Sequence, residues 1–228
     1  VTGHEYKIEN NQPDNTRKAP VIMVATVGKS AYLDALEKSG ELDLSRIRGK
    51  REVYDFRIME PATLLIAGSD KRGTIYGLFH LSEIIGVSPW VWFADVVPAH
   101  KDVIELTQKD NKISREPSVK YRGFFINDEW PSFGNWTFKH FGGFTVQMYD
   151  RVFELLLRLK GNYLWPAMWT SSFSLDGPGL DNALLADEYG IVMSNSHHEP
   201  CLRHSEEWDL VRGDDSIYGN AWIYDRNK

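Results

Sequence analysis

The chain has 228 residues, enough for one large or two modest domains with a hydrophobic core, and its 42% hydrophobic and 25% charged residues are ordinary for a globular protein. The formal net charge of -6 argues against a nonspecific nucleic-acid binder, because such proteins need concentrated Lys and Arg to face phosphate. The single Cys201 excludes a disulfide within the chain and a zinc site built from cysteines. No apolar stretch approaches the roughly 18 to 20 residues of a membrane span, so neither nucleic acid nor a membrane is an expected partner.

The first half of the chain alternates predicted strands and helices. The expected strands span residues 20–27, 51–59, 63–68 and 103–108. The expected helices span residues 30–38 and 70–85, and the first of them has Ser30 as its N-cap and Gly40 as its stop signal. These elements predict a small α/β domain with a mixed sheet, which we assign to residues 1–113. The polar stretch 111–118, which includes Pro117, is the expected linker.

Two clusters in this first domain each allow a functional and a structural interpretation. Residues 68–73 join a strand to a helix, where backbone N–H groups could hold a phosphate or a carboxylate. Neither the Rossmann nor the P-loop spacing is present, so we favour the alternative that Asp70 caps the helix. Trp90, Trp92 and Phe93 lie together within residues 89–95, and such aromatic residues stack on sugar rings but more often pack between domains.

The second half, residues 119–228, predicts a β-α-β-α-β unit. Apolar runs that predict strands begin at Tyr121, Asn162 and Gly190. Residues 180–189 predict the shorter of the two helices. The longer helix spans residues 145–160, where apolar side chains recur at three- and four-residue spacing: Met148, Val152, Phe153, Leu156, Leu157 and Leu159. Strands that alternate with helices favour a parallel sheet.

Polar or aromatic residues follow each of the three predicted strands. They are Asn127, Asp128 and Glu129 after the first strand, Trp169 after the second, and His197, His198 and Glu199 after the third. Ligands gather at the carboxyl ends of parallel strands, so these residues form the candidate site. The structural alternative for Asp128 and Glu129 is a salt-bridged or helix-capping pair.

The aromatic content favours a carbohydrate ligand. The chain has 8 Trp, 10 Tyr and 11 Phe, which together make 13% of its residues. The apolar C–H face of a pyranose lies flat against an indole, while its hydroxyls need carboxylates, amides and imidazoles. Trp169 beside Asp128 and His197 would supply that mixture, whereas Trp165 is interpreted as a packing residue.

A metal site is the alternative for the tract from His197 to Glu199. Adjacent residues of a strand face opposite ways, so His197 and His198 would rarely bind one ion together. We therefore expect no metal and no cofactor.

Five motifs in this sequence closely resemble those of glycoside hydrolase family 115, the xylan α-1,2-glucuronidases. They are GSDKRGTIYG from Gly68, GVSPW from Gly86, YRGFFINDE from Tyr121, LWPAMW from Leu164 and SHHEP from Ser196. The resemblance extends from about residue 20 onward. It departs from the family pattern at residues 194–196, where Ser-Asn-Ser replaces the more usual Gly-Thr-Ser, and at Cys201 and Leu202, where methionines are common.

The resemblance implies a function and roles for particular residues. It implies an inverting hydrolase that removes glucuronic acid, often 4-O-methylated, from glucuronoxylan, and such a polymeric substrate implies an extracellular or periplasmic enzyme. Asp128 then resembles a catalytic or substrate-binding carboxylate, Trp169 a wall of the sugar pocket, and His197 a hydrogen-bonding partner of the uronic acid. The roles of Glu129, His198 and Glu199 are less defined by the resemblance. Family members often dimerise, which here would involve regions outside this chain.

The implied fold is a small noncatalytic α/β domain followed by the first part of a TIM-like (β/α)₈ barrel. A full barrel takes about 250 residues, far more than residues 119–228 provide. The family's catalytic glutamate lies on a later strand, so we expect the 228-residue chain to be an inactive fragment on its own. The alternatives are a noncatalytic carbohydrate-binding or assembly module and a related uronic-acid or amino-sugar hydrolase.

Overall fold

The computed structural model describes residues 1–10, 20–59, 62–128, 130–169, 171–177, 179–195 and 207–208. The chain divides into two compact units. Unit 1 comprises Val1–Lys120 with Leu157–Lys160, and unit 2 comprises Tyr121–Leu156 with Gly161–Lys228. None of the described helices is both long and apolar enough to cross a membrane.

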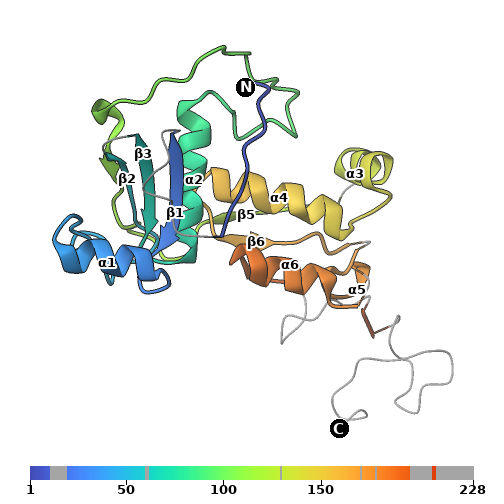
Figure 1. Cartoon of the computed structure of the whole chain (residues 1–228). Helices are drawn as coiled ribbons and strands as arrows, with labels where there is room; N and C mark the ends of the chain where they lie inside the picture. The colour runs from blue at the N-terminus through green and yellow to red at the C-terminus, as the bar shows by residue number, and fades with distance from the viewer. Residues whose placement is uncertain are drawn as a thin grey trace, which may run out of the picture. The chain divides into compact units, whose positions relative to one another are not determined.

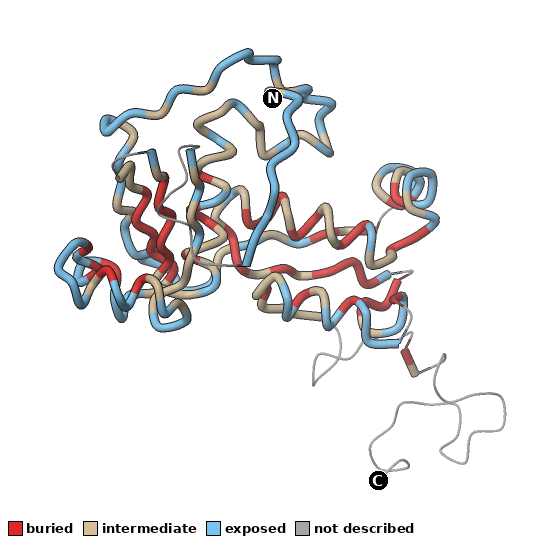
Figure 2. The backbone as a smooth tube through the Cα atoms, in the orientation of Figure 1, coloured by how far each residue is buried: buried red, intermediate tan, exposed pale blue. Residues whose placement is uncertain are grey.

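Unit 1 is built on a mixed four-stranded sheet of order β1-β3-β2-β4 (Figure 1). Its strands are β1 (Val21–Thr26), β2 (Tyr54–Met59), β3 (Thr63–Gly68) and β4 (Lys112–Ile113). β1 runs parallel to β3, and β2 runs antiparallel to both β3 and β4. β3 lies between two partners and is buried along most of its length, as Figure 2 shows.

The two helices of unit 1 begin and end where the sequence predicts. α1 (Ala31–Ser39) starts after Ser30, whose side chain accepts a hydrogen bond from the Leu33 amide, and it stops at Gly40 in the left-handed conformation. α2 (Lys71–Ile84) starts after Asp70, whose carboxylate accepts from the Gly73 amide. Short polar side chains at these N-caps satisfy amides that have no partner inside the helix. The residues of α1 contribute to a buried cluster with those that follow it and with β3: Leu33, Leu36, Leu42, Leu44, Ile47, Val53, Leu65 and Ala67.

The end of unit 1 differs in two ways from the sequence predictions. Residues 103–108 form no strand and lead instead into the 3₁₀ helix η1 (Gln108–Asp110). The predicted linker 111–118 is partly built into the sheet. Its residues Lys112 and Ile113 form β4, and the Ser114 amide donates to the Tyr54 carbonyl at 2.9 Å.

Unit 2 contains the predicted parallel sheet, of order β5-β6-β7. Its strands are β5 (Gly123–Phe125), β6 (Tyr163–Trp165) and β7 (Val192–Met193). Both pairings are parallel. The carboxyl ends of all three strands therefore lie along one edge of the sheet.

α4 (Val146–Arg158) connects β5 to β6 and supplies much of the core of unit 2. Its apolar stripe is buried as predicted, apart from Leu159, which lies beyond the end of the helix and is 44% exposed. One core member is a residue that the apolar pattern did not identify, Tyr149, which is wholly buried. The buried residues of this helix are Met148, Tyr149, Val152, Phe153, Leu155, Leu156 and Leu157.

Along the described part of unit 2, three further helices have defined bounds. α6 (Asp181–Tyr189) is the predicted short helix, and it ends at Gly190 in the left-handed conformation. The sequence patterns did not predict α3 (Phe133–Phe141) or α5 (Phe173–Asp176). These two helices follow the carboxyl ends of β5 and β6 respectively, so they lie on the same side of unit 2 (Figure 1).

Candidate functional site

Asp128 lies just beyond the carboxyl end of β5. The Ile126 amide still donates to the Trp165 carbonyl at 2.8 Å, so the pairing with β6 continues one residue past the strand. The Asp128 side chain is wholly buried. Its Oδ1 accepts from the Trp169 amide at 2.9 Å and from the Met168 amide at 3.3 Å, and its Oδ2 lies 3.1 Å from the same Trp169 amide. The carboxylate therefore clamps the segment that leaves β5 to the segment that leaves β6.

Trp169 is the second predicted residue that the structure brings to this place. Its backbone amide donates to Asp128, and the residue is 49% exposed. A half-exposed indole offers an apolar surface of the kind on which a sugar ring stacks. Trp165, by contrast, packs its ring against Phe125 at a centroid distance of 5.2 Å, which agrees with its interpretation as a packing residue.

The other predicted site residues are placed only in part. Asn127 is half-buried between Ile126 and Asp128. Glu129, His197, His198 and Glu199 lie outside the described residues. Within the described residues no three His, Cys, Asp or Glu side chains gather as a metal site would require. The tract from His197 to Glu199 lies outside the described residues, so the expectation of no metal there stays a prediction.

A second carboxylate, which sequence reasoning missed, lies near Asp128. Asp176 ends α5, and its Oδ2 accepts from the Ser172 amide at 2.7 Å. The residue keeps contact with solvent, while surrounding protein removes water from its carboxyl group. This loss of hydration is the main cause that raises its pKa to about 6, the Ser172 amide opposes the rise, and the Asp128 carboxylate adds to it. Asp176 follows β6, so the strand-end rule offered a signal for it.

Tyr149 brings a phenol to the same group of carboxylates. Its ring meets that of Phe173 edge to face at a centroid distance of 4.8 Å. Burial raises the pKa of Tyr149 well above its ordinary value, and the negative charges of Asp176 and Asp128 raise it further. The phenol therefore stays protonated at physiological pH and lies near both carboxylates.

Glu207 secures the start of α5. The side chain is almost completely buried, and its Oε1 accepts from the Ser172 hydroxyl at 2.9 Å and from the Ser174 hydroxyl. Because Ser172 also donates its amide to Asp176, Glu207 helps to fix the segment that positions Asp176. No periodic pattern in the sequence links residue 207 to residues 172–176, so this contact could not be predicted.

The raised pKa of Asp176 predicts a pH-dependent stability. Between the ordinary value of 3.8 and about 6, the folded protein binds more protons than the unfolded chain. The free energy of unfolding therefore falls as the pH rises through this window. We expect Asp176→Asn to remove that part of the fall, which denaturant unfolding at a series of pH values measures. Asp181→Asn, at an exposed aspartate in the first turn of α6, should keep the wild-type dependence, and an unchanged pH dependence in Asp176→Asn would contradict the assignment.

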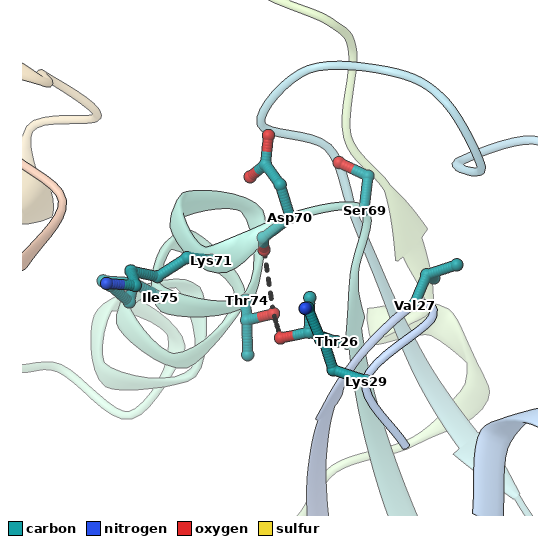
Figure 3. Close-up of a pocket in the computed structure, with 8 residues that line it drawn as sticks. All are labelled: Thr26, Val27, Lys29, Ser69, Asp70, Lys71, Thr74 and Ile75. Carbon is teal, nitrogen blue, oxygen red and sulfur yellow. Dashed lines mark hydrogen bonds between the residues drawn. The ribbon is translucent and has the colours of Figure 1, made fainter. Parts of the chain in front are cut away.

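A separate hollow of about 490 Å³ lies in unit 1, between β1, β3 and the start of α2 (Figure 3). Its lining includes Ser69, Asp70 and Lys71, which belong to the segment 68–73 that could hold an anion. The Asp70 carboxylate already accepts from the Gly73 amide at 2.7 Å and from the Glu52 amide at 2.9 Å. The hydrogen bond from the Gly73 amide confirms that Asp70 caps α2. The negative charge of Asp70 also repels an added anion.

The aromatic residues within 89–95 could stack on a sugar or pack between domains, and the structure does not distinguish these two roles. Trp90 and Trp92 are each nearly half exposed. Such exposure is compatible with stacking on a sugar and with packing against further protein, so both functions stay predictions.

The arrangement at the ends of β5 and β6 defines what unit 2 can do chemically. Asp128 offers an oriented carboxylate, and Asp176 a carboxyl group that exchanges its proton within about one unit of neutral pH. Trp169 adds an open apolar surface. An oriented carboxylate and a carboxyl group with a raised pKa are suited to acid–base chemistry, and an exposed indole is suited to stacking on a sugar ring.

Comparison with known proteins shows the family of this chain. A solved structure of a family 115 4-O-methyl-alpha-glucuronidase, with specificity for decorated arabinogalactans, is similar to this chain with 37% sequence identity and a TM-score of 0.75. The likeness covers 90% of this chain but only 26% of that enzyme. No curated protein matches the chain. The model of glycosyl hydrolase family 115 matches residues 114–228, just over half of the chain. The protein therefore belongs to glycosyl hydrolase family 115.

Proposed function

We propose that the protein containing this chain is a glycoside hydrolase that removes α-linked glucuronic acid, with or without a 4-O-methyl group, from a polysaccharide. Membership of family 115 and the likeness to a 4-O-methyl-alpha-glucuronidase support this proposal. The observation that carries it is the buried Asp128 carboxylate, which the amides of Met168 and of the half-exposed Trp169 hold at the ends of two parallel strands.

The proposed reaction is an inverting hydrolysis. Inversion needs one carboxyl group that protonates the leaving oxygen and another that activates water on the opposite face, about 6.5 to 9.5 Å apart. In this proposal Asp128 is one catalytic carboxylate and Glu129 its neighbour in the site. The general acid is a glutamate on a later strand, outside this chain.

The remaining predicted residues bind the sugar in this proposal. The indole of Trp169 stacks on the uronic acid ring, and Asn127, His197, His198 and Glu199 supply hydrogen bonds to its hydroxyls and carboxylate. Imidazoles suit this role because each ring nitrogen donates or accepts according to its protonation.

We further propose that β5, β6 and β7 begin a (β/α)₈ barrel. Their parallel order and the intervening helices α4 and α6 support this. The chain spans about a quarter of the related enzyme, so the remaining strands and the general acid lie elsewhere in the full-length protein. The 228-residue chain by itself is then inactive.

Two polysaccharides are candidate substrates. The sequence motifs favour glucuronoxylan, in which glucuronic acid is α-1,2-linked to xylose. The related solved enzyme is specific for decorated arabinogalactans, which favours that class instead. Both present the same terminal sugar, so the site at Asp128 does not by itself distinguish between them.

The test is an assay of the full-length protein on both polymers. We expect release of glucuronic acid or its 4-O-methyl ether from one of them, measured by chromatography. Proton NMR at early times should show the β-anomer first, because inversion of an α linkage produces it. If neither polymer releases uronic acid, the proposed function is contradicted. If the α-anomer is the first product, only the inverting mechanism is contradicted and the proposed function stands.

A further inference from the structure

Trp130 is a half-exposed aromatic residue next to the proposed site. It follows Asp128 by two positions, so their α-carbons lie within about 7 Å of each other. The residue is 47% exposed. It lies in the segment that joins the carboxyl end of β5 to α3.

The indole of Trp130 is supported from one side by α3. A Cβ placed on Gly134 would come within 2.7 Å of the indole ring, so the ring lies directly on the backbone of α3. The Phe138 ring packs beside it at a centroid distance of 5.3 Å. An indole held in this way needs little further ordering when it binds a ligand, which favours its use as a rigid binding surface.

The segment that follows Trp130 has no charged side chain. Residues 130–134 read Trp-Pro-Ser-Phe-Gly and include neither a cation nor an anion. A glucuronic acid ring bears a carboxylate that is best bound by cationic or several donor side chains, and among the side chains that follow Trp130 in this segment only Ser132 offers a hydroxyl. A neutral pyranose instead presents an apolar C–H face that an indole can cover.

We propose that Trp130 forms the subsite for the neutral sugar to which the glucuronic acid is attached. This inference rests on the proposed function, because it places the glucuronic acid at Asp128 and Trp169. The bond to be cleaved then lies between the two half-exposed indoles, with Trp169 on the side of the uronic acid and Trp130 on the side of the polysaccharide.

The experiment separates the two subsites in the full-length enzyme. Trp130→Ala is expected to raise KM for the polysaccharide about tenfold, as loss of a single aromatic anchor does, and to leave kcat within about twofold. The inhibition constant of free glucuronic acid, which occupies only the other subsite, should stay unchanged. Tyr121→Ala is the matched control, because Tyr121 is a half-exposed aromatic residue of the same unit at the opposite end of β5.

A second variant displaces the indole without removing it. Gly134→Ala puts a methyl group where the Trp130 ring lies, so the ring must move, while alanine itself favours the helix. We expect KM for the polysaccharide to rise in this variant as well. Trp130→Phe, which keeps a smaller aromatic face, should recover part of the wild-type KM.

Each outcome has a distinct meaning. An unchanged KM in Trp130→Ala would overturn the inference and leave the proposed function intact. Equal losses for the polysaccharide and for free glucuronic acid would also overturn it, because Trp130 would then serve the uronic acid pocket. If wild-type protein releases no uronic acid, the proposed function itself fails.

Discussion

Asp128→Asn is expected to lower kcat for release of glucuronic acid by the full-length protein about a thousandfold. The substitution keeps the shape of the side chain but removes the charge that a base or a transition-state partner must supply. Loss of such a group typically lowers the rate by roughly two to four orders of magnitude. The Asn oxygen can still accept from the Trp169 amide, so the position of the side chain is retained. Initial rates on the polysaccharide measure the effect.

The control for Asp128→Asn must separate catalysis from folding. Asp128 is wholly buried and bonded to two backbone amides, so part of its role is structural, and loss of its charge can lower the free energy of unfolding by about 1–3 kcal/mol. Denaturant unfolding of the variant should therefore still show a folded protein. Asp181→Asn should keep full activity. Retention of wild-type kcat in Asp128→Asn would exclude this carboxylate from the chemistry.

Gly123→Ala is expected to lower the free energy of unfolding by about 3 kcal/mol or more. A Cβ at Gly123 would lie only 1.6 Å from the Tyr163 carbonyl oxygen, which belongs to the paired strand β6. The obstacle is backbone rather than a movable side chain, so β5 and β6 must separate to make room. Denaturant unfolding followed by far-ultraviolet circular dichroism measures the change.

Gly142→Ala provides the contrast for Gly123→Ala. Gly142 ends α3 at a φ of 76°, with nothing within 4 Å of an added Cβ. Alanine there suffers only the strain of the left-handed conformation, about 1 kcal/mol. Equal effects of the two substitutions would show that the close approach of β5 to β6 does not limit the residue at position 123.

Sequence patterns predicted the elements that depend on local signals. Ser30 and Asp70 cap their helices as expected, and Gly40 and Gly190 end theirs, because these positions follow from the chemistry of the residue itself. The parallel order of β5, β6 and β7 followed from the alternation of strands with helices.

The elements that the sequence patterns failed to predict depend on contacts with other parts of the fold. Residues 103–108 are apolar enough to predict a strand but pair with none of the described strands, whereas β4 forms from two polar-flanked residues that pair with β2. α3 escaped prediction because its buried residues, Gly134 and Thr137, are not the large apolar side chains that mark an amphipathic helix.

In the candidate site, too, some residues follow from local sequence signals and others only from tertiary contacts. The strand-end rule identified Asp128 and Trp169, which the structure brings together through a hydrogen bond between a carboxylate and an amide. Asp176, Tyr149 and Glu207 lie on separate helical segments, and only packing in three dimensions brings them near this position. The position of Asp176 after β6 was a signal that the strand-end rule offered, whereas sequence spacing has no signal for the contacts of Tyr149 and Glu207.

The central claim is that glucuronic acid binds where β5 and β6 end. A crystal structure of the full-length protein soaked with glucuronic acid tests it most directly. We expect the sugar ring against the Trp169 indole, with the Asp128 carboxylate within hydrogen-bonding distance of a hydroxyl or of the water that attacks the anomeric carbon. A sugar bound elsewhere, with Asp128 sealed behind the Met168 and Trp169 amides, would contradict the claim and leave Asp128 a purely structural residue.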